Sequence, residues 1–285
     1  MHISTSDKAK VKAIFAKLNL PQRLSHKGQN GKVLIIGGSS LFHSASLWAA
    51  EVASHFADMV HYSSTIENEK IFHDLKKTFR NGIIIPQKDL DQYVVQDEVI
   101  LIGPGMMREG EEGKYTFELT CSLIAKYPEK KFVFDAGALQ MMNKELLFKL
   151  KTPPILTPHQ KEFEALFGIS IIDKGEGEKE KIVKEIASKY KVVILLKAIT
   201  DYVSDGRSSF AIEGGNAGLT KGGTGDVLAG LTASFFVSNT AFDSATLASI
   251  LLKSAADSLF ENSGYWYNVD DIIKRLPEVL KDLKL

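Results

Sequence analysis

A glycine loop followed by an aspartate is the feature of this sequence best suited to chemistry. The loop is Gly222-Gly223-Thr224-Gly225, and Asp226 follows it directly. Apolar residues recur at helical spacing after Asp226, so the loop is expected to open a helix. The N-terminus of a helix offers free N–H donors and about half a positive charge. The loop is therefore a candidate phosphate site.

Asp226 is unusual at the rim of an anion site, because a carboxylate repels phosphate. One interpretation is that Asp226 orients or deprotonates a hydroxyl that attacks the phosphate. The other is that it only caps the helix, since aspartate is favoured at helix starts. The motif leaves both open and makes Asp226 a candidate catalytic residue.

Apolar runs alternate with helical patterns along the chain. This alternation predicts an α/β fold, in which helices cover both faces of a mostly parallel central sheet. We expect a single domain over residues 1–285, with 1–30 as a peripheral N-terminal segment. The clearest strand candidates are 32–38, 98–105, 131–137 and 192–197, and helices are expected at 138–149 and 160–167, whereas the charged run 173–184 indicates a loop or a helix start.

Several candidate functional residues follow these strands. Ligands of open α/β sheets bind at the carboxyl ends of the strands, so we expect Asp135, His159 and Lys197 to meet the glycine loop in one cleft. Each has a structural alternative. Asp135 can form a turn, His159 can cap a helix, and Lys197 can extend its charge to solvent over an apolar stem.

The composition excludes some classes of partner. The chain has 35 basic and 35 acidic residues, so its net charge is zero and predicts no nucleic-acid or basic membrane surface. No run reaches the ~20 apolar residues that span a bilayer. Cys121 is the single cysteine, which excludes an intrachain disulfide. We expect a cytoplasmic protein.

Together these motifs resemble the ADP/ATP-dependent NAD(P)H-hydrate dehydratase family of the ribokinase-like superfamily. The resemblance spans residues 32–236. It is carried by Lys32-Val-Leu-Ile-Ile-Gly-Gly-Ser-Ser40 with Ser44-Ala-Ser-Leu47, Leu101-Ile-Gly-Pro-Gly105, Phe134-Asp-Ala-Gly-Ala-Leu139, Leu156-Thr-Pro-His-Gln-Lys-Glu-Phe163, Leu196-Lys-Ala198 and the glycine motif 215–230. The combination of Thr-Pro-His-x-x-Glu with the long glycine motif is the most specific part.

The resemblance implies a ribokinase-like fold and a repair reaction on nicotinamide cofactors whose ring has been hydrated. A nucleotide phosphoryl group would be transferred to the ring hydroxyl, and phosphate would then leave, restoring NADH or NADPH. It implies that Asp226 prepares the hydroxyl and that Mg²⁺ is held near Glu162, directly or through water. The implied substrate contacts are Ala45, Gly105, His159 and Asp226, and the implied nucleotide contacts are Lys197, Ala198, Ile199, Thr200, Asp201, Gly222, Gly223, Thr224 and Gly225.

The resemblance also implies partners. ADP is favoured over ATP as co-substrate, and a separate NAD(P)H-hydrate epimerase is expected, because only about 30 residues precede the first strand of the matching region. Helices rich in alanine and serine suit a subunit interface, so we expect a homo-oligomer, with a tetramer as one assembly. The family more often has Lys-Gly-x-x-Thr where this chain has Lys197-Ala-Ile-Thr-Asp201.

Two other functions use the same features. A kinase of the same superfamily, acting on a small alcohol such as hydroxyethylthiazole, would need the same loop and aspartate, but its product would keep the phosphate. A nucleotide-sensing module would bind without turnover. Asp226 argues against the sensor, because binding alone gains nothing from an acid beside phosphate.

Overall fold

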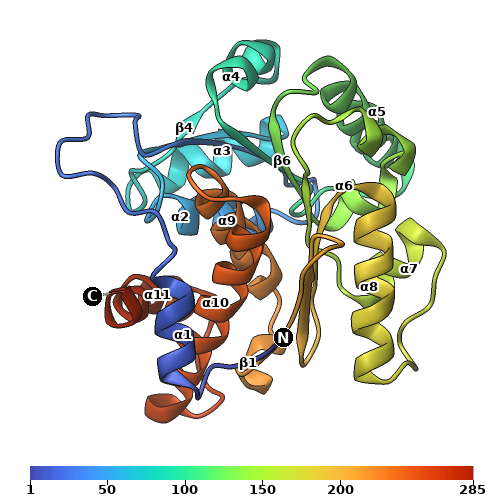
Figure 1. Ribbon diagram of the computed structural model, residues 1–285. Helices are drawn as coiled ribbons and strands as arrows, with labels where there is room; N and C mark the ends of the chain where they lie inside the picture. The colour runs from blue at the N-terminus through green and yellow to red at the C-terminus, as the bar shows by residue number, and fades with distance from the viewer. Residues whose placement is uncertain (285) are drawn as a thin grey trace.

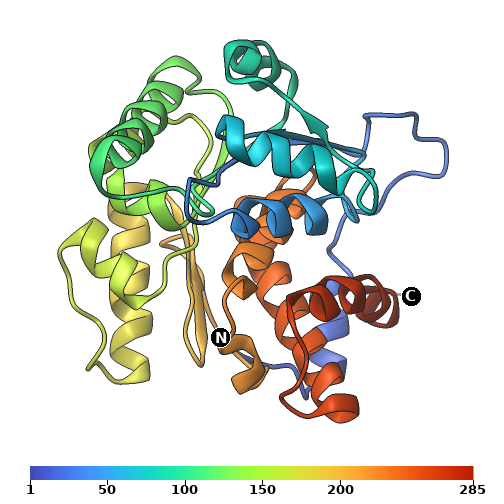
Figure 2. The ribbon, with the colours of Figure 1, turned by 180° about the vertical axis from the view of Figure 1, so that it is seen from behind.

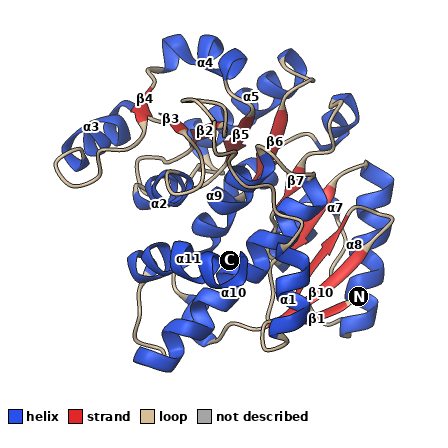
Figure 3. Ribbon diagram, turned by 60° about the vertical axis from the view of Figure 1, so that its left-hand side comes forward, coloured by secondary structure: helices blue, strands red, loops and turns tan. Residues whose placement is uncertain are grey.

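One ten-stranded sheet forms the centre of the protein, whose computed structural model describes residues 1–284. The strand order is β1-β10-β9-β8-β7-β6-β5-β2-β3-β4, and every pairing is parallel except the two made by β9. Figure 3 shows the strands as one twisted row between helices. The strands are β1 (His2–Ser4), β2 (Lys32–Ile36), β3 (Met59–Ser63), β4 (Ile83–Ile84), β5 (Val99–Ile102), β6 (Lys131–Phe134), β7 (Ile155–Leu156), β8 (Val193–Leu196), β9 (Asp201–Ser204) and β10 (Ser209–Glu213).

Helices cover both faces of this sheet, as the sequence predicts, and divide the core into two apolar clusters. One face carries α1 (Lys8–Phe15), α2 (Ser44–Ala53), α3 (Ile66–Leu75), α9 (Thr224–Phe236), α10 (Ala241–Ser263) and α11 (Val269–Lys284). The other carries α4 (Leu90–Gln96), α5 (Gly110–Lys126), α6 (Ala136–Met141), α7 (Gln160–Phe167) and α8 (Glu176–Tyr190). Figures 1 and 2 show α5–α8 on the opposite side of the sheet from α10 and α11.

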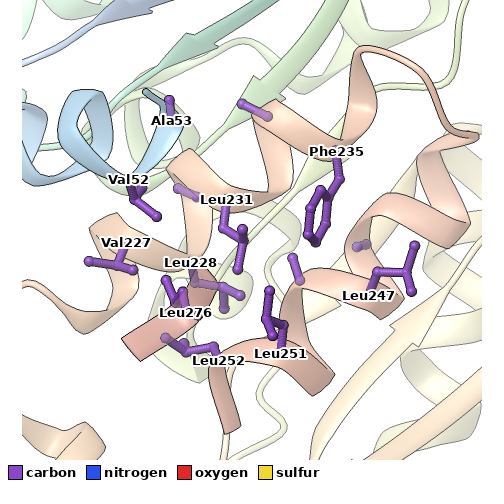
Figure 4. Packing of buried hydrophobic residues seen from close by; sticks show 14 of the residues in the cluster. Val52, Ala53, Val227, Leu228, Leu231, Phe235, Leu247, Leu251, Leu252 and Leu276 are labelled. Carbon is purple, nitrogen blue, oxygen red and sulfur yellow. The ribbon is translucent and has the colours of Figure 1, made fainter. Parts of the chain in front are cut away.

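Helix α9 lies at the centre of the first cluster. It contacts the sheet together with α2, α10 and α11, and all its residues from Val227 to Phe236 are buried. Figure 4 shows Leu228 and Leu231 directed toward Leu251 and its neighbours on α10. The small residues of α9 and α10 thus allow close packing within one chain, so they are not evidence for a subunit interface. The homo-oligomer stays a prediction.

The N-terminal residues are more integrated than a peripheral segment would be. Strand β1 pairs with β10 at the edge of the sheet, and Ile3, Val11 and Phe15 are fully buried. Lys284 at the end of α11 donates to backbone carbonyls at the end of α1, including that of Phe15 at 3.0 Å. Residues 1–15 therefore complete the core beside α10 and α11.

Two expected elements differ from those observed. The helix expected over 138–149 is two pieces, α6 and a 3₁₀ helix (Lys144–Lys149), because Met142 adopts an extended conformation and the Asn143 side chain caps a new turn. The charged run at 173–184 enters α8, whose apolar side buries Val183 and Ile186. Helices α3 and α4 were not predicted.

Candidate active site

Asp226 occupies the first turn of α9, and the glycine loop precedes it as the sequence predicts. The helix begins at Thr224 with Gly223 as its N-cap residue, and no side chain caps this N-terminus. Gly223 has φ +102°, and a Cβ there would lie 2.5 Å from the Trp48 ring. A glycine is required because of both the backbone angle and this close contact. Asp226 is not the N-cap residue, but it lies in the first turn, where an acidic side chain is also favourable, so its catalytic role stays a prediction.

Lys197 connects the glycine loop to the end of strand β6. Its Nζ donates to Asp135 Oδ1 at 2.7 Å and lies 3.8 Å from Glu162 Oε2. A Cβ built on Gly225 would lie 3.4 Å from the same Nζ, so Lys197 extends beside the start of α9. Burial alone lowers the pKa of Lys197, but the nearby carboxylates of Asp135 and Glu162 outweigh it and raise this pKa. The Lys197 side chain is 18% exposed and its charge is paired with Asp135, so it does not extend freely into solvent.

Asp135 is held rigidly at the same place. It is almost fully buried, and Thr157 Oγ1 donates to its Oδ1 at 2.7 Å. Thr157 follows β7, so the ends of three neighbouring strands, β6, β7 and β8, meet at this carboxylate. Asp135 thus acts as the fixed partner of Lys197.

His159 and Glu162 form a capping box at the start of α7. His159 Nδ1 accepts from the backbone N–H of Lys161 at 3.1 Å and of Glu162 at 3.2 Å, and the Glu162 carboxylate accepts from the His159 N–H at 2.8 Å. The box confirms the helix-cap interpretation of His159. Its Nδ1 is an acceptor, which leaves Nε2 as the protonated nitrogen. The imidazole is about half exposed, and its Nε2 lies 3.4 Å from Glu162 Oε1.

Burial and the charges of Asp135, Lys197 and Glu162 change the pKa of Asp226. Burial and then the nearby Asp135 carboxylate raise the pKa of Asp226 to about 7, against the opposing effect of Lys197. A carboxylate with a pKa close to neutral can accept a proton from a hydroxyl more effectively than an ordinary aspartate. The arrangement therefore places a candidate general base beside the glycine loop.

Side chains of helix α10 hold the loop from Ala198 to Asp201 in place. Asp201 is buried and accepts from the Ala198 N–H at 3.0 Å and from Ser249 Oγ at 2.7 Å. Lys253 Nζ lies 3.6 Å from Asp201 and donates to the Ile199 carbonyl at 2.8 Å. Thr200 is also buried, whereas Ile199 is 95% exposed. Asp201 thus shapes the loop, and Ile199 is the member of this expected nucleotide set that faces outward most.

The remaining substrate candidates, Ala45 and Gly105, lie together. A Cβ on Gly105 would lie 3.0 Å from the Ala45 Cβ and 3.3 Å from Gly38 Cα. Ala45 lies in the first turn of α2, which packs along α9. A cavity of about 510 Å³ opens on the other side of Gly38, at the carboxyl ends of β2, β3 and β5, and Asp226 does not line it. We name it the Tyr115 cavity, after a residue that it shares with Gly38, Ser39, Ser64, Glu67 and Met106.

The residues around Lys197 would hold a magnesium ion only together with a bound phosphate that supplies further oxygen ligands. Within residues 1–284 no group of three or more His, Cys, Asp or Glu side chains could hold a metal ion by itself. Mg²⁺ usually takes one or two carboxylates, waters and substrate phosphates. Asp135, Glu162 and Asp226 surround one lysine, so a phosphate would enter a site with excess negative charge. A divalent cation near Glu162 would remove this conflict.

Two members of the cluster were not singled out from the sequence. Thr157 holds Asp135, and Gln140 Nε2 lies 3.4 Å from Glu162 Oε1. Thr157 belongs to the Thr-Pro-His motif, so its place beside His159 was a usable signal. Gln140 lies in the expected helix after Asp135, and nothing in its type or spacing marks it.

None of the helices within residues 1–284 has the length and apolar character needed to cross a bilayer.

Comparisons with known proteins agree on one family. A model of the NAD(P)H-hydrate dehydratase family matches residues 33–278. The chain is 31% identical to the ADP-dependent (S)-NAD(P)H-hydrate dehydratase of Streptococcus thermophilus, over 92% of this chain and 94% of that protein. It is 35% identical to the bifunctional NAD(P)H-hydrate repair enzyme Nnr of Methanocaldococcus jannaschii, over 90% of this chain and 49% of that protein. The chain thus spans about half the length of the first curated relatives that it matches.

The fold is also shared with solved structures. The crystal structure of the ADP/ATP-dependent NAD(P)H-hydrate dehydratase from Bacillus subtilis, co-crystallized with ATP and Mg²⁺, superposes with a TM-score of 0.78 and 22% identity, covering 99% of both chains. This similarity confirms the ribokinase-like α/β fold.

Proposed function

Because the chain belongs to the NAD(P)H-hydrate dehydratase family, we propose that it uses a nucleotide to remove water from hydrated NADH or NADPH. The observation that carries this proposal is Asp226, a partly buried carboxylate with a pKa raised to about 7 at the mouth of a glycine loop. ADP is the preferred phosphoryl donor, as in the relative from Streptococcus thermophilus.

The reaction needs a phosphoryl transfer because hydroxide is a poor leaving group at neutral pH. Asp226 takes the proton of the ring hydroxyl as its oxygen attacks the terminal phosphorus, and the bond to the nucleotide's bridging oxygen breaks. The ring nitrogen then donates its electron pair, the carbon–oxygen bond breaks, and phosphate leaves. Loss of a proton from the adjacent ring carbon restores the double bond. The products are NAD(P)H, phosphate and AMP, or ADP when ATP is the donor.

The two sides of the site divide these tasks. Backbone N–H groups from Gly222 to Gly225 and the Lys197 ammonium stabilise the charge of the transferring phosphoryl group. The loop from Ala198 to Asp201 contacts the nucleotide, with Ile199 as its most exposed side chain. Ala45, Gly105 and the half-exposed imidazole of His159 orient the hydrated ring. These assignments extend the family resemblance to positions of this chain.

Magnesium would be held by the phosphates and by Glu162, directly or through a water, and supplies neutralising charge to the phosphoryl group. The relative crystallized with ATP and Mg²⁺ supports this assignment. Glu162→Gln keeps the oxygen that accepts the His159 N–H, so it should preserve α7. We expect it to raise the magnesium concentration needed for half-maximal rate by about tenfold. An unchanged magnesium requirement would remove Glu162 from the metal site.

The activity is tested by supplying hydrated NADH with ADP, with ATP or with neither, and following NADH absorbance and free phosphate. We expect both to appear in equal amounts, faster with ADP than with ATP, and neither without nucleotide. Hydroxyethylthiazole, supplied in parallel, tests the kinase alternative. A phosphorylated alcohol as product, with no NADH formed from the hydrate, would contradict the proposal.

A further inference from the structure

The Tyr115 cavity lies on the same edge of the sheet as Asp226 but is not part of the catalytic cluster. It opens at the carboxyl ends of β2, β3 and β5, where ligands of open α/β sheets bind. A series of contacts joins the cavity to the helix that carries Asp226. Gly38 lines the cavity and lies against Gly105. Gly105 also contacts Ala45, which lies in the first turn of α2, and α2 packs on α9. A volume of about 510 Å³ is enough for a nucleoside.

The walls of the cavity offer both an apolar surface and polar groups that the protein does not use. Tyr115 is 37% exposed and shares the cavity with Met106 and Met107, which together suit a flat heterocyclic ring. Glu112 is engaged, since Ser40 donates to its carboxylate through the backbone N–H at 3.0 Å and through Oγ at 2.7 Å. Among residues 1–284, Glu67, Lys70 and Glu111 have no side-chain hydrogen bond or ion pair, so they are free to meet a ligand.

The charges of this lining favour one kind of ligand. Three carboxylates, Glu67, Glu111 and Glu112, face the cavity with a single cation, Lys70. A carboxylate accepts a hydrogen bond from the 2′-hydroxyl of an adenosine ribose, as in NAD sites of other α/β proteins, whereas sites for the 2′-phosphorylated cofactor use arginine. A phosphate on that ribose would meet like charges here.

We propose that the Tyr115 cavity binds the adenosine end of the dinucleotide substrate and discriminates against its 2′-phosphate. The protein therefore prefers the hydrate of NADH over that of NADPH. The hydrated nicotinamide ring lies at Asp226, and the pyrophosphate of the dinucleotide passes the small residues Gly38, Gly105 and Ala45, which lie together. This inference rests on the proposed function for the identity of the substrate.

The first test measures kcat/KM for the two hydrates and, separately, the affinities for NADH and NADPH by calorimetry. We expect NADH and its hydrate to be favoured by about fivefold at low salt, since two unit charges about 4 Å apart in water repel by about 1 kcal/mol. The preference should shrink as salt is raised. Equal values of both constants for the two cofactors would overturn the inference.

Variants make the test specific to the cavity. The double change Glu67→Lys with Glu111→Lys should reverse the preference, and the neutral pair Glu67→Gln with Glu111→Gln should abolish it. Glu129→Lys with Glu261→Lys, the same change of charge on two exposed residues outside this cavity, is the matched control and should leave the ratio unchanged. Tyr115→Ala should weaken binding of NADH and NADPH alike. A ratio that responds equally to the control and the cavity variants would overturn the inference.

The two proposals fail differently. If neither hydrate is turned over but NADH binds more tightly than NADPH and the cavity variants reverse this, the cavity inference stands and the proposed reaction is wrong. If both hydrates are turned over equally well by every variant, the reaction stands and the cavity inference is wrong.

Discussion

Two aspartates lie near lysines on the carboxyl edge of the sheet, and their surroundings differ. Asp201 is buried, whereas Asp226 is only partly buried. Asp201 accepts from the Ala198 N–H and the Ser249 hydroxyl, and Lys253 lies 3.6 Å away. Lys253 is itself occupied by the Ile199 carbonyl. Asp201, Ser249 and Lys253 are thus paired within this group, and together they hold the loop from Ala198 to Asp201 in place.

The group around Asp226 is left open. There Lys197 is already engaged by Asp135 at 2.7 Å, and Asp135 in turn accepts from Thr157. Within residues 1–284 no other side chain donates a hydrogen bond to Asp226, and burial followed by the charge of Asp135 raises its pKa to about 7. Burial also raises the pKa of Asp201. A partly buried acid thus becomes a candidate for catalysis when the charged groups near it are already paired with one another.

The largest expected effect that separates the two groups is on catalysis. Asp226→Asn keeps the shape of the side chain but removes the base, so we expect dehydration to fall by at least ~10²-fold. Nucleotide binding, measured by calorimetry, should persist. Turnover like that of the unchanged protein would eliminate the catalytic assignment of Asp226.

Asp201→Ala should instead destabilise the fold, because it leaves the Lys253 charge buried without its carboxylate. We expect a loss of about 3 kcal/mol in the free energy of unfolding, measured with denaturant. The double variant Asp201→Ala with Lys253→Met removes both charges and should recover most of this loss. If the single variant is as stable as the parent, the Asp201 group does not anchor the loop.

The pH dependence of kcat/KM should report Asp226 in the free protein. The base must be unprotonated, so the rate constant should fall by about tenfold per pH unit below the pKa of about 7 and level off above it. The residual activity of Asp226→Asn should lack this step. A step that persists in the variant would belong to another group.

The smallest expected effect is a stability difference with a defined sign. The folded state keeps the proton of Asp226 between its ordinary pKa and about 7, so its contribution to stability is present at low pH and lost as pH rises through about 7. Asp226→Asn carries no charge, and we expect it to be more stable than the parent by at least about 1 kcal/mol near pH 8. The difference should vanish near pH 4, as thermal unfolding at both values would show. A variant less stable near pH 8 would mean that Asp226 has a partner it needs.

Local signals in the sequence were sufficient to predict some of the helices and loops that form the candidate site. Helix α7 lies at the expected residues, 160–167, because His159 and Glu162 close a capping box before it and Gly168 ends it in a left-handed conformation. The glycine loop and the helix after it were also predicted from local signals, namely the clustered glycines and the apolar residues at helical spacing after Asp226. Strand β1 was missed, since three residues give no periodic pattern, and its pairing with β10 is made only in the folded chain.

Local sequence signals could not predict which charged residues are paired with one another. Asp135 and Lys197 are 62 positions apart, and each had an acceptable alternative by itself. Only the meeting of β6, β7 and β8 at one edge decides that Lys197 is paired with Asp135 and that Asp226 is not. The role of Asp201 follows from α10, which brings Ser249 and Lys253 beneath the loop.

The burial of α9 has a further consequence for how the protein works. Its residues from Val227 to Phe236 are enclosed by α2, α10, α11 and the sheet, so the helix that carries Asp226 cannot shift without disturbing the core. Any induced fit during turnover therefore belongs to the loops around it, above all to the outward tip at Ile199. In the proposed reaction, the Asp226 carboxylate is therefore the stationary point toward which the two substrates are brought.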